Sequence, residues 1–135
     1  MGTTIDWDGA LNQVADDEEF LQEVLGDLQS ETEDALATIK KGMSQRTFTI
    51  VMKAAHQIKG SAAYLCCTDL QNVAKNLQML GNEGVSMLDG KEEGGGRAAR
   101  GADTIWVEIG NVFAELEGKF GLLRIEIGGH TWAPV

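Results

Sequence analysis

A histidine, a lysine and a glycine stand close together in this sequence, as His56, Lys59 and Gly60. Side chains three and four residues apart are neighbours on a helix, so the three would share one side of it. An unperturbed imidazole has a pKa of about 6.5 and offers a nucleophilic ring nitrogen near neutral pH. A lysine one turn away can hold its ammonium beside an anionic group, such as a phosphoryl group, on that ring. Glycine inside a helix costs about 1 kcal/mol relative to alanine, which indicates that open space beside the imidazole is useful.

The segment around these residues has the clearest helical pattern in the chain. Its apolar residues recur at helical spacing and predict one buried stripe: Phe48, Val51, Met52, Ala55, Ile58, Ala62 and Leu65. Polar and small residues lie opposite this stripe, among them Lys53, His56 and Ala63. The imidazole is therefore predicted to project away from the core.

Three further amphipathic segments and a short opening helix accompany this one. The predicted helices cover about residues 8–14, 16–41, 46–65, 68–81 and 103–121. Gly42 and Gly81 are expected to end the second and fourth of them. Thr68 and Gln71 form the pattern of a capping box, and Asp103 or Thr104 can cap the last helix.

Four amphipathic segments bury their apolar faces most economically in an antiparallel four-helix bundle. The expected fold is therefore all-α, with a short extra N-terminal helix. We expect one domain over residues 1–135 with its core at 16–121, a flexible glycine-rich loop at about 82–102, and a tail at 122–135 whose alternating β-branched residues leave its structure open.

Composition excludes several classes of function. The net charge of −10 argues against a nucleic-acid surface, which needs clustered lysine and arginine. No stretch reaches the roughly 18 apolar residues of a membrane span, and the N-terminus lacks the pattern of a signal peptide. Cys66 and Cys67 are adjacent and cannot form a disulfide framework. A reducing compartment is expected, the cytoplasm or also the nucleus.

Residues 46–81 resemble the histidine-containing phosphotransfer (HPt) family. The family pattern is a histidine, a lysine three residues later, a glycine directly after it, then small residues and a leucine, and the run 55–65 has all of these in register. The resemblance implies a phosphorelay carrier with His56 as phosphoacceptor and Lys59 stabilising the phosphoryl group. It also implies that receiver domains of hybrid kinases and response regulators are the partners and supply Mg²⁺ and most catalytic groups. The chain would then be a carrier that is not itself an enzyme, a monomer by default, and without cofactor or metal of its own.

Gln78 matches the region where many members hold a glutamine that orients the phosphorylatable histidine. The resemblance thus implies that Gln78 bonds one ring nitrogen and leaves the other for phosphorylation. Lys53, Gly60 and Ala63 are the expected partner-binding residues. The chain departs from the family at Cys66, where members usually have glycine, so the turn after the histidine helix is expected to be built differently.

Other interpretations stand beside this one. The bundle could dock receivers without relaying a phosphoryl group, although pseudo-HPt proteins of that kind lose the histidine that this chain keeps. The two cysteines with His130 make a poor metal-ligand set. An independent enzyme is the weakest hypothesis, since no nucleophile–base pair or carboxylate–histidine cluster has suitable spacing.

Overall fold

The computed structural model describes residues 4–88 and 101–132, and this part of the chain forms five helices and no strand. The helices are α1 (Trp7–Gln13), α2 (Glu18–Ser44), α3 (Phe48–Tyr64), α4 (Thr68–Leu88) and α5 (Ala102–Gly129). Within these residues, no helix is long and apolar enough to cross a membrane.

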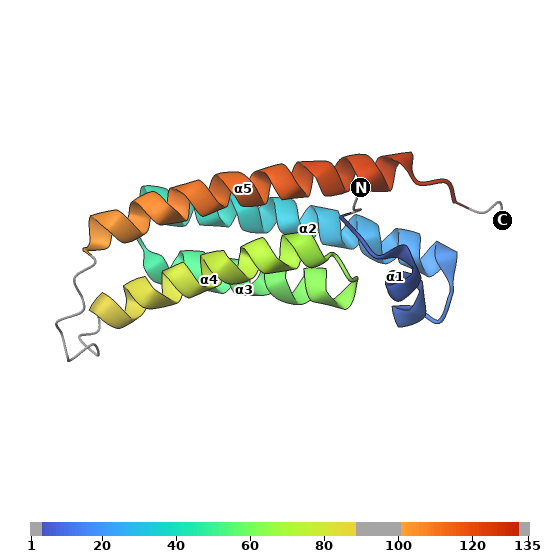
Figure 1. The fold of residues 1–135 in the computed structure, drawn as a ribbon, viewed down its shortest axis with the longest axis horizontal. Helices are drawn as coiled ribbons and strands as arrows, with labels where there is room; N and C mark the ends of the chain where they lie inside the picture. The colour runs from blue at the N-terminus through green and yellow to red at the C-terminus, as the bar shows by residue number, and fades with distance from the viewer. Residues whose placement is uncertain (1–3, 89–100, 133–135) are drawn as a thin grey trace.

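The four long helices lie side by side in alternating directions, and α1 covers the end where α3 turns into α4 (Figure 1). α3 packs between α2 and α4, and α5 closes the bundle by packing on α4 and α2. The antiparallel four-helix bundle with an extra N-terminal helix is therefore confirmed.

The hydrophobic core reaches beyond the predicted range of 16–121. Ile5, Ala10 and Val14 from the N-terminal segment are buried, and so is Leu123 near the end of α5. The segment that contains α1 covers the end of the bundle and adds its own apolar side chains to the core. The predicted boundary missed this because a seven-residue helix shows too little periodicity to reveal a buried face.

The predictions that Gly42 and Gly81 end their helices are wrong. Both residues are helical and buried, and α2 continues to Ser44. A Cβ atom at Gly81 would lie 3.0 Å from the backbone nitrogen of Met52, and one at Gly42 would lie 2.8 Å from the side chain of Ile50. These glycines are needed because neighbouring helices approach too closely there for a side chain.

The predicted loop at 82–102 is also partly wrong. α4 continues through residues 82–88 and α5 begins at Ala102, while residues 89–100 lie outside the described part of the chain. Gly84 explains the longer α4, because a Cβ at that position would overlap the ring of Phe48. The helix therefore continues across the start of α3.

The N-terminal caps of α4 and α5 also differ from those predicted. Gly101 holds the N-cap position of α5, so neither Asp103 nor Thr104 caps it. Thr68 is already helical, and Cys67 before it accepts the amide of Gln71 with its carbonyl. In the tail, residues 122–129 simply extend α5, because Leu123 continues its buried stripe.

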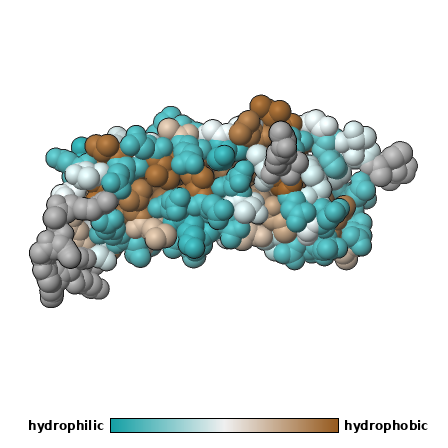
Figure 2. Space-filling view, viewed as in Figure 1, coloured by the Kyte–Doolittle hydropathy of each residue, from teal (hydrophilic) through white to brown (hydrophobic). Residues whose placement is uncertain are grey.

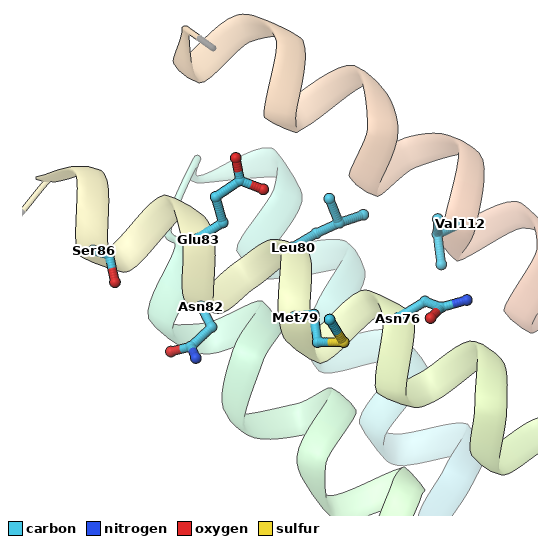
Figure 3. A pocket seen from close by; sticks show the side chains of 7 residues that line it. All are labelled: Asn76, Met79, Leu80, Asn82, Glu83, Ser86 and Val112. Atoms are coloured by element: carbon cyan, nitrogen blue, oxygen red, sulfur yellow. The ribbon is translucent and has the colours of Figure 1, made fainter. Parts of the chain in front are cut away.

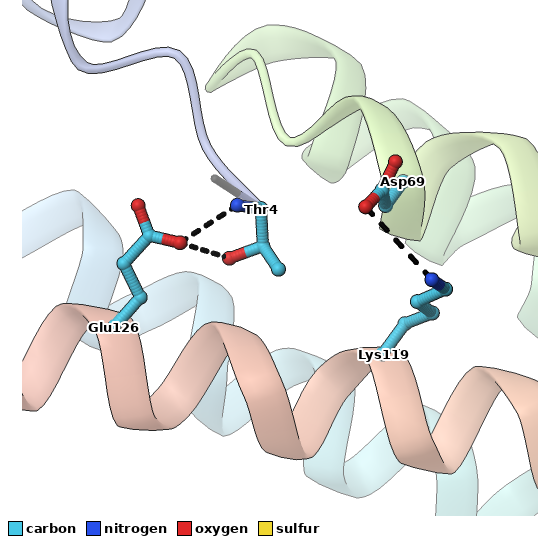
Figure 4. Close-up of polar contacts among 4 residues, drawn as sticks. All are labelled: Thr4, Asp69, Lys119 and Glu126. Carbon is cyan, nitrogen blue, oxygen red and sulfur yellow. Dashed lines mark hydrogen bonds and ion pairs between the residues drawn. The ribbon is translucent and has the colours of Figure 1, made fainter. Parts of the chain in front are cut away.

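The N-terminal segment ties two distant parts of the bundle together. Thr4 donates from its amide and its hydroxyl to Glu126 at 2.7 and 2.6 Å, and Trp7 Nε1 donates to the same carboxylate at 3.0 Å. Figure 4 shows the Thr4 bonds and also, two turns earlier in α5, the 3.9 Å ion pair of Lys119 with Asp69. The amide of Asp6 in turn donates to the carbonyl of Cys66, in the turn between α3 and α4, at 3.0 Å.

The carboxylate of Glu126 is held in its charged form by these contacts. Partial burial alone would raise its pKa, but the hydrogen bonds from Thr4 and Trp7 and the nearby His130 outweigh burial, so the pKa lies below its ordinary value of 4.5. Trp7 also stacks on His130, with ring centroids 3.7 Å apart. The end of α5 is therefore anchored by both charge and ring contacts.

We predict that Glu126→Gln lowers the free energy of unfolding at pH 7 by about 1 kcal/mol, because charge-assisted bonds become neutral ones. A lowered pKa stabilises the fold above the unfolded-state value, and that stabilisation is lost as the pH falls through the lower folded-state value. The difference between wild type and variant, measured by urea unfolding, should therefore shrink below about pH 4.5. The exposed Glu115→Gln serves as control and should change stability by less than about 0.5 kcal/mol at either pH.

Candidate functional site

His56 lies on the outer side of α3, near the middle of the helix, and its side chain is exposed. Ala55, directly before His56, and Ile58, two residues after it, are only 0% and 1% exposed. The buried stripe and the imidazole therefore lie on opposite sides of the helix, as predicted. Lys53, Gly60 and Ala63 are exposed on the same outer side. The structure thus brings together on one ridge the predicted phosphoacceptor and the three predicted partner-binding residues.

Gly60 differs from the glycines that hold the helices together. A Cβ atom built at Gly60 would meet no other atom within 4 Å, whereas one at Gly84 would overlap Phe48. Nothing inside the described chain therefore requires glycine at position 60. Glycine lowers the stability of a helix relative to alanine, and no contact inside the described chain offsets this loss at position 60. This points to a need for open space outside the protein, one turn from His56.

Gln78 lies level with His56 across the contact between α3 and α4. The two helices are antiparallel, and Gly81 stands directly against Met52. One turn further along α3 from Met52 is His56, and one turn back along α4 from Gly81 is Gln78. This register, which the sequence alone could not fix, brings the two predicted site residues to the same height in the bundle.

The amide oxygen of Gln78 has an unusual environment. The side chain is half-buried, and its Oε1 is buried without a hydrogen-bond partner among the described residues. A buried acceptor without a donor costs about 1–3 kcal/mol. No hydrogen bond to His56 is formed in this conformation, so the amide oxygen of Gln78 is an acceptor that still lacks a donor.

Lys59 lies one turn from His56 on the edge of α3 that faces α4, and its side chain is half-buried. Packing of its methylene groups along the helix edge is the usual way for lysine to cover apolar surface while its ammonium stays in water. Within residues 4–88 and 101–132, the ion pairs are made by other cations. The ammonium of Lys59 is therefore available to an anion bound at His56.

The sequence analysis did not identify the residues on the side of this ridge that faces α2. A groove of about 370 Å³ runs between α2 and α3 beside Gly60, and its lining includes Tyr64, Asp27 and Glu31. Tyr64 is 46% exposed although it is a large aromatic residue. Its spacing four residues after Gly60 was the signal that could have placed it on the ridge. Lys53 borders a second groove of about 340 Å³ between the same helices.

Another groove lies between α4 and α5, with a volume of about 620 Å³. Figure 3 shows its lining from α4, with Met79 and Leu80 among mostly polar side chains, and Val112 from α5. Its lining contains no histidine, lysine, arginine or cysteine, so it offers no imidazole or thiol and no cation for an anionic ligand. The candidate site is therefore the ridge around His56.

The cysteine pair offers little reactivity. Burial, helped by the nearby Cys66 and Glu126, raises the pKa of the Cys67 thiol to about 12, so it stays protonated. Among the residues that the structure describes, no three histidine, cysteine or acidic side chains gather as metal ligands. Cys66 does adopt a left-handed conformation with φ of 60°, which is the backbone geometry that glycine provides most easily.

Comparison with known proteins gives one match. The family model described as Hpt domain matches residues 23–112, from α2 into α5. This range includes all of α3 and α4 and hence His56, Lys59 and Gln78. No curated protein and no solved structure matches the chain.

The contrast between the glycines can be tested by stability alone. Gly60→Ala should raise the free energy of unfolding by about 1 kcal/mol, because it gains helix propensity and meets open space. Gly84→Ala makes the same chemical change but should lower it by about 1–3 kcal/mol, because the new methyl group would overlap Phe48. Urea unfolding of both variants measures the difference. A loss of stability in Gly60→Ala would show that position 60 is a packing glycine.

Proposed function

The chain belongs to the Hpt domain family, and on that premise we propose that it relays a phosphoryl group between receiver-domain aspartates, with His56 as the acceptor. Histidine phosphotransfer within two-component phosphorelays is what the family match supports. The identity of the acceptor rests on one observation: His56 is exposed in the middle of α3, beside a glycine that nothing inside the described chain requires.

The proposed step is an in-line transfer between two side chains. A ring nitrogen of neutral His56 attacks the phosphorus of the receiver's aspartyl phosphate, an N–P bond forms, and the bond to the aspartate oxygen breaks. The aspartate leaves as a carboxylate, and the second ring nitrogen keeps its proton. The reverse reaction passes the phosphoryl group to another receiver. The family resemblance implies that Mg²⁺ comes with the receiver, so this chain contributes the nucleophile and the surface around it.

Gln78 would select the ring nitrogen. Its buried Oε1 accepts no hydrogen bond in this structure, and the register of the two helices places residue 78 level with residue 56. A bond from one protonated nitrogen of His56 would satisfy that oxygen, fix the tautomer, and leave the other nitrogen unprotonated and pointing outward. This is the geometry that a nucleophile needs, and it supports the orienting role proposed for Gln78.

Lys59 would stabilise the phosphorylated state. It lies one turn from the imidazole, and its ammonium can reach an anionic group on the ring. A transferred phosphoryl group carries negative charge that a nearby lysine stabilises as a point charge. The ammonium would then favour the phosphorylated form of His56 without taking part in the bond exchange.

The receiver would dock on the ridge of α3 and its two flanks. Gly60 and Ala63 give close approach near the imidazole, while Lys53 can attract the acidic pocket in which a receiver holds its aspartate. The groove beside Gly60, with the exposed ring of Tyr64, would take an apolar side chain of the partner. A module that docks receivers without relay would use the same surface, so only a transfer experiment separates the two functions.

We predict that a phosphorylated receiver domain with Mg²⁺ transfers its label to the wild-type chain and not to His56→Gln. The label should be stable in alkali and labile in acid, as expected of a phosphoramidate. His130→Gln is the matched control, because His130 is the second of the chain's two histidines and lies at the end of α5. Transfer to His56→Gln at the wild-type rate would reject the assignment. Absence of transfer to the wild type from several receivers would favour the docking module.

We also predict that Gly60→Gln lowers receiver affinity at least tenfold while the bundle stays folded, since a long side chain then fills the space beside His56. Binding can be measured by isothermal titration calorimetry and folding by circular dichroism. Gly26→Gln provides the control: Gly26 is an exposed helix glycine on α2, it too meets no atom within 4 Å, and it lies away from α3. Equal affinity of the two variants would contradict the proposed contact.

A further inference from the structure

A second lysine, Lys75 of α4, lies at the height of the candidate site. Gly81 stands directly against Met52, and α3 and α4 are antiparallel. Lys75 is six residues before Gly81, which corresponds to a position six residues after Met52 on α3. This register places residue 75 about level with Lys59. The two lysines are therefore at the same height on neighbouring helices, one turn along the bundle from His56.

Lys75 is also on the side of α4 that faces α3. Figure 3 shows Leu80 pointing from α4 towards Val112 of α5, whereas Asn82 points away from α5, to the side where α3 lies. Residues seven positions apart in a helix are two turns apart and share a side, so Lys75 is on the side of Asn82. Its side chain is exposed and can extend over the line where α4 meets α3.

The ammonium of Lys75 has no acidic neighbour on its own helix. The residues three and four positions away, where a helix forms its ion pairs, are Gln71, Asn72, Gln78 and Met79. Of the two acidic residues of α4, Asp69 pairs with Lys119 of α5, and Glu83 lines the groove towards α5. In the described part of the chain, the ion pairs are made by other cations. The charge of Lys75 is therefore available to an anion from outside.

The surface around His56 is cationic although the chain as a whole is acidic, with 21 acidic and 11 basic residues. α3 carries Lys53 and Lys59 and no acidic residue along its whole length. The acidic side chains near the ridge, Asp27 and Glu31, line its other flank, towards α2. Figure 2 shows apolar surface along the line where α4 meets α5, and largely hydrophilic surface over α4 and the visible part of α3. An anion is therefore attracted to the α3–α4 side of the ridge.

We propose that Lys75 is a second phosphoryl-stabilising residue, which holds the phosphoryl group on His56 from α4 while Lys59 holds it from α3. The inference rests on the proposed function, because it needs a phosphoryl group on His56. A phosphoryl group on a side chain carries about two negative charges near neutral pH, so one lysine balances only half of its charge. A lysine acts as a flexible point charge, and it can therefore contribute from a neighbouring helix without a fixed geometry.

Phosphorus NMR of the full chain, phosphorylated with phosphoramidate, tests the proposal without a receiver. In that reaction a ring nitrogen of histidine replaces the nitrogen of phosphoramidate on phosphorus, and the latter leaves as ammonia. The signal that is absent from His56→Gln belongs to His56, and its pH titration gives the midpoint of the second ionisation of the phosphoryl group. A nearby cation lowers this midpoint because it favours the dianion. Lys75→Gln should therefore raise it by about 0.3–0.5 pH unit, the effect of one unit charge roughly a helix turn away in water.

Two further variants separate charge at the site from other effects. Lys40→Gln is the matched control, because Lys40 is an exposed lysine that lines a groove between α2 and α5, away from His56. It should leave the midpoint unchanged, and Lys75→Arg, which keeps the charge, should preserve the wild-type value. A midpoint that stays in place in Lys75→Gln, or that moves equally in Lys40→Gln or Lys75→Arg, would overturn the inference and leave the proposed relay standing. If no signal depended on His56, the acceptor assignment would fail, and this inference with it.

Discussion

The close contact between α3 and α4 is the constraint on which the rest of this structure depends. Gly81 against Met52 and Gly84 against Phe48 leave no room for a side chain, so the two helices can slide past one another very little without a clash. This contact fixes their register. Because the register is fixed, an exposed histidine on one helix and a half-buried glutamine on the other lie at the same height, and a site can form from two separate segments.

Glycines serve two opposite purposes in this bundle. Gly42, Gly81 and Gly84 are buried and let helices or side chains approach closely, whereas others, Gly26 and Gly60 among them, face open space. The first kind stabilises the fold because it allows apolar contact that a methyl group would prevent. The second kind has no benefit within the described chain. At Gly60 the open space lies one turn from the exposed His56, which is why this glycine and not another is proposed as a point of partner contact.

The ends of the bundle are held by a different kind of interaction. Thr4 and Trp7 bond to Glu126, and Asp6 bonds to the carbonyl of Cys66, so the N-terminal segment joins α5 to the turn that follows α3. The left-handed conformation of Cys66 in that turn shows how the chain manages without the glycine usual in the family: a strained residue is stabilised by its neighbours. The turn is thereby supported close to the helix that presents His56.

The sequence by itself determined the helical fold, the buried stripe of α3 and the exposure of His56, because these follow from local spacing: a 3.6-residue period fixes which side of a helix is apolar. It did not determine where α2, α4 and α5 end. Gly42 and Gly81 resemble helix stops locally, and only the neighbouring helix decides that they are contact points. The height of Gln78 relative to His56 was likewise decided by tertiary structure, as was the open space at Gly60. Each depends on which surfaces meet and which are left free, and packing between distant segments decides that.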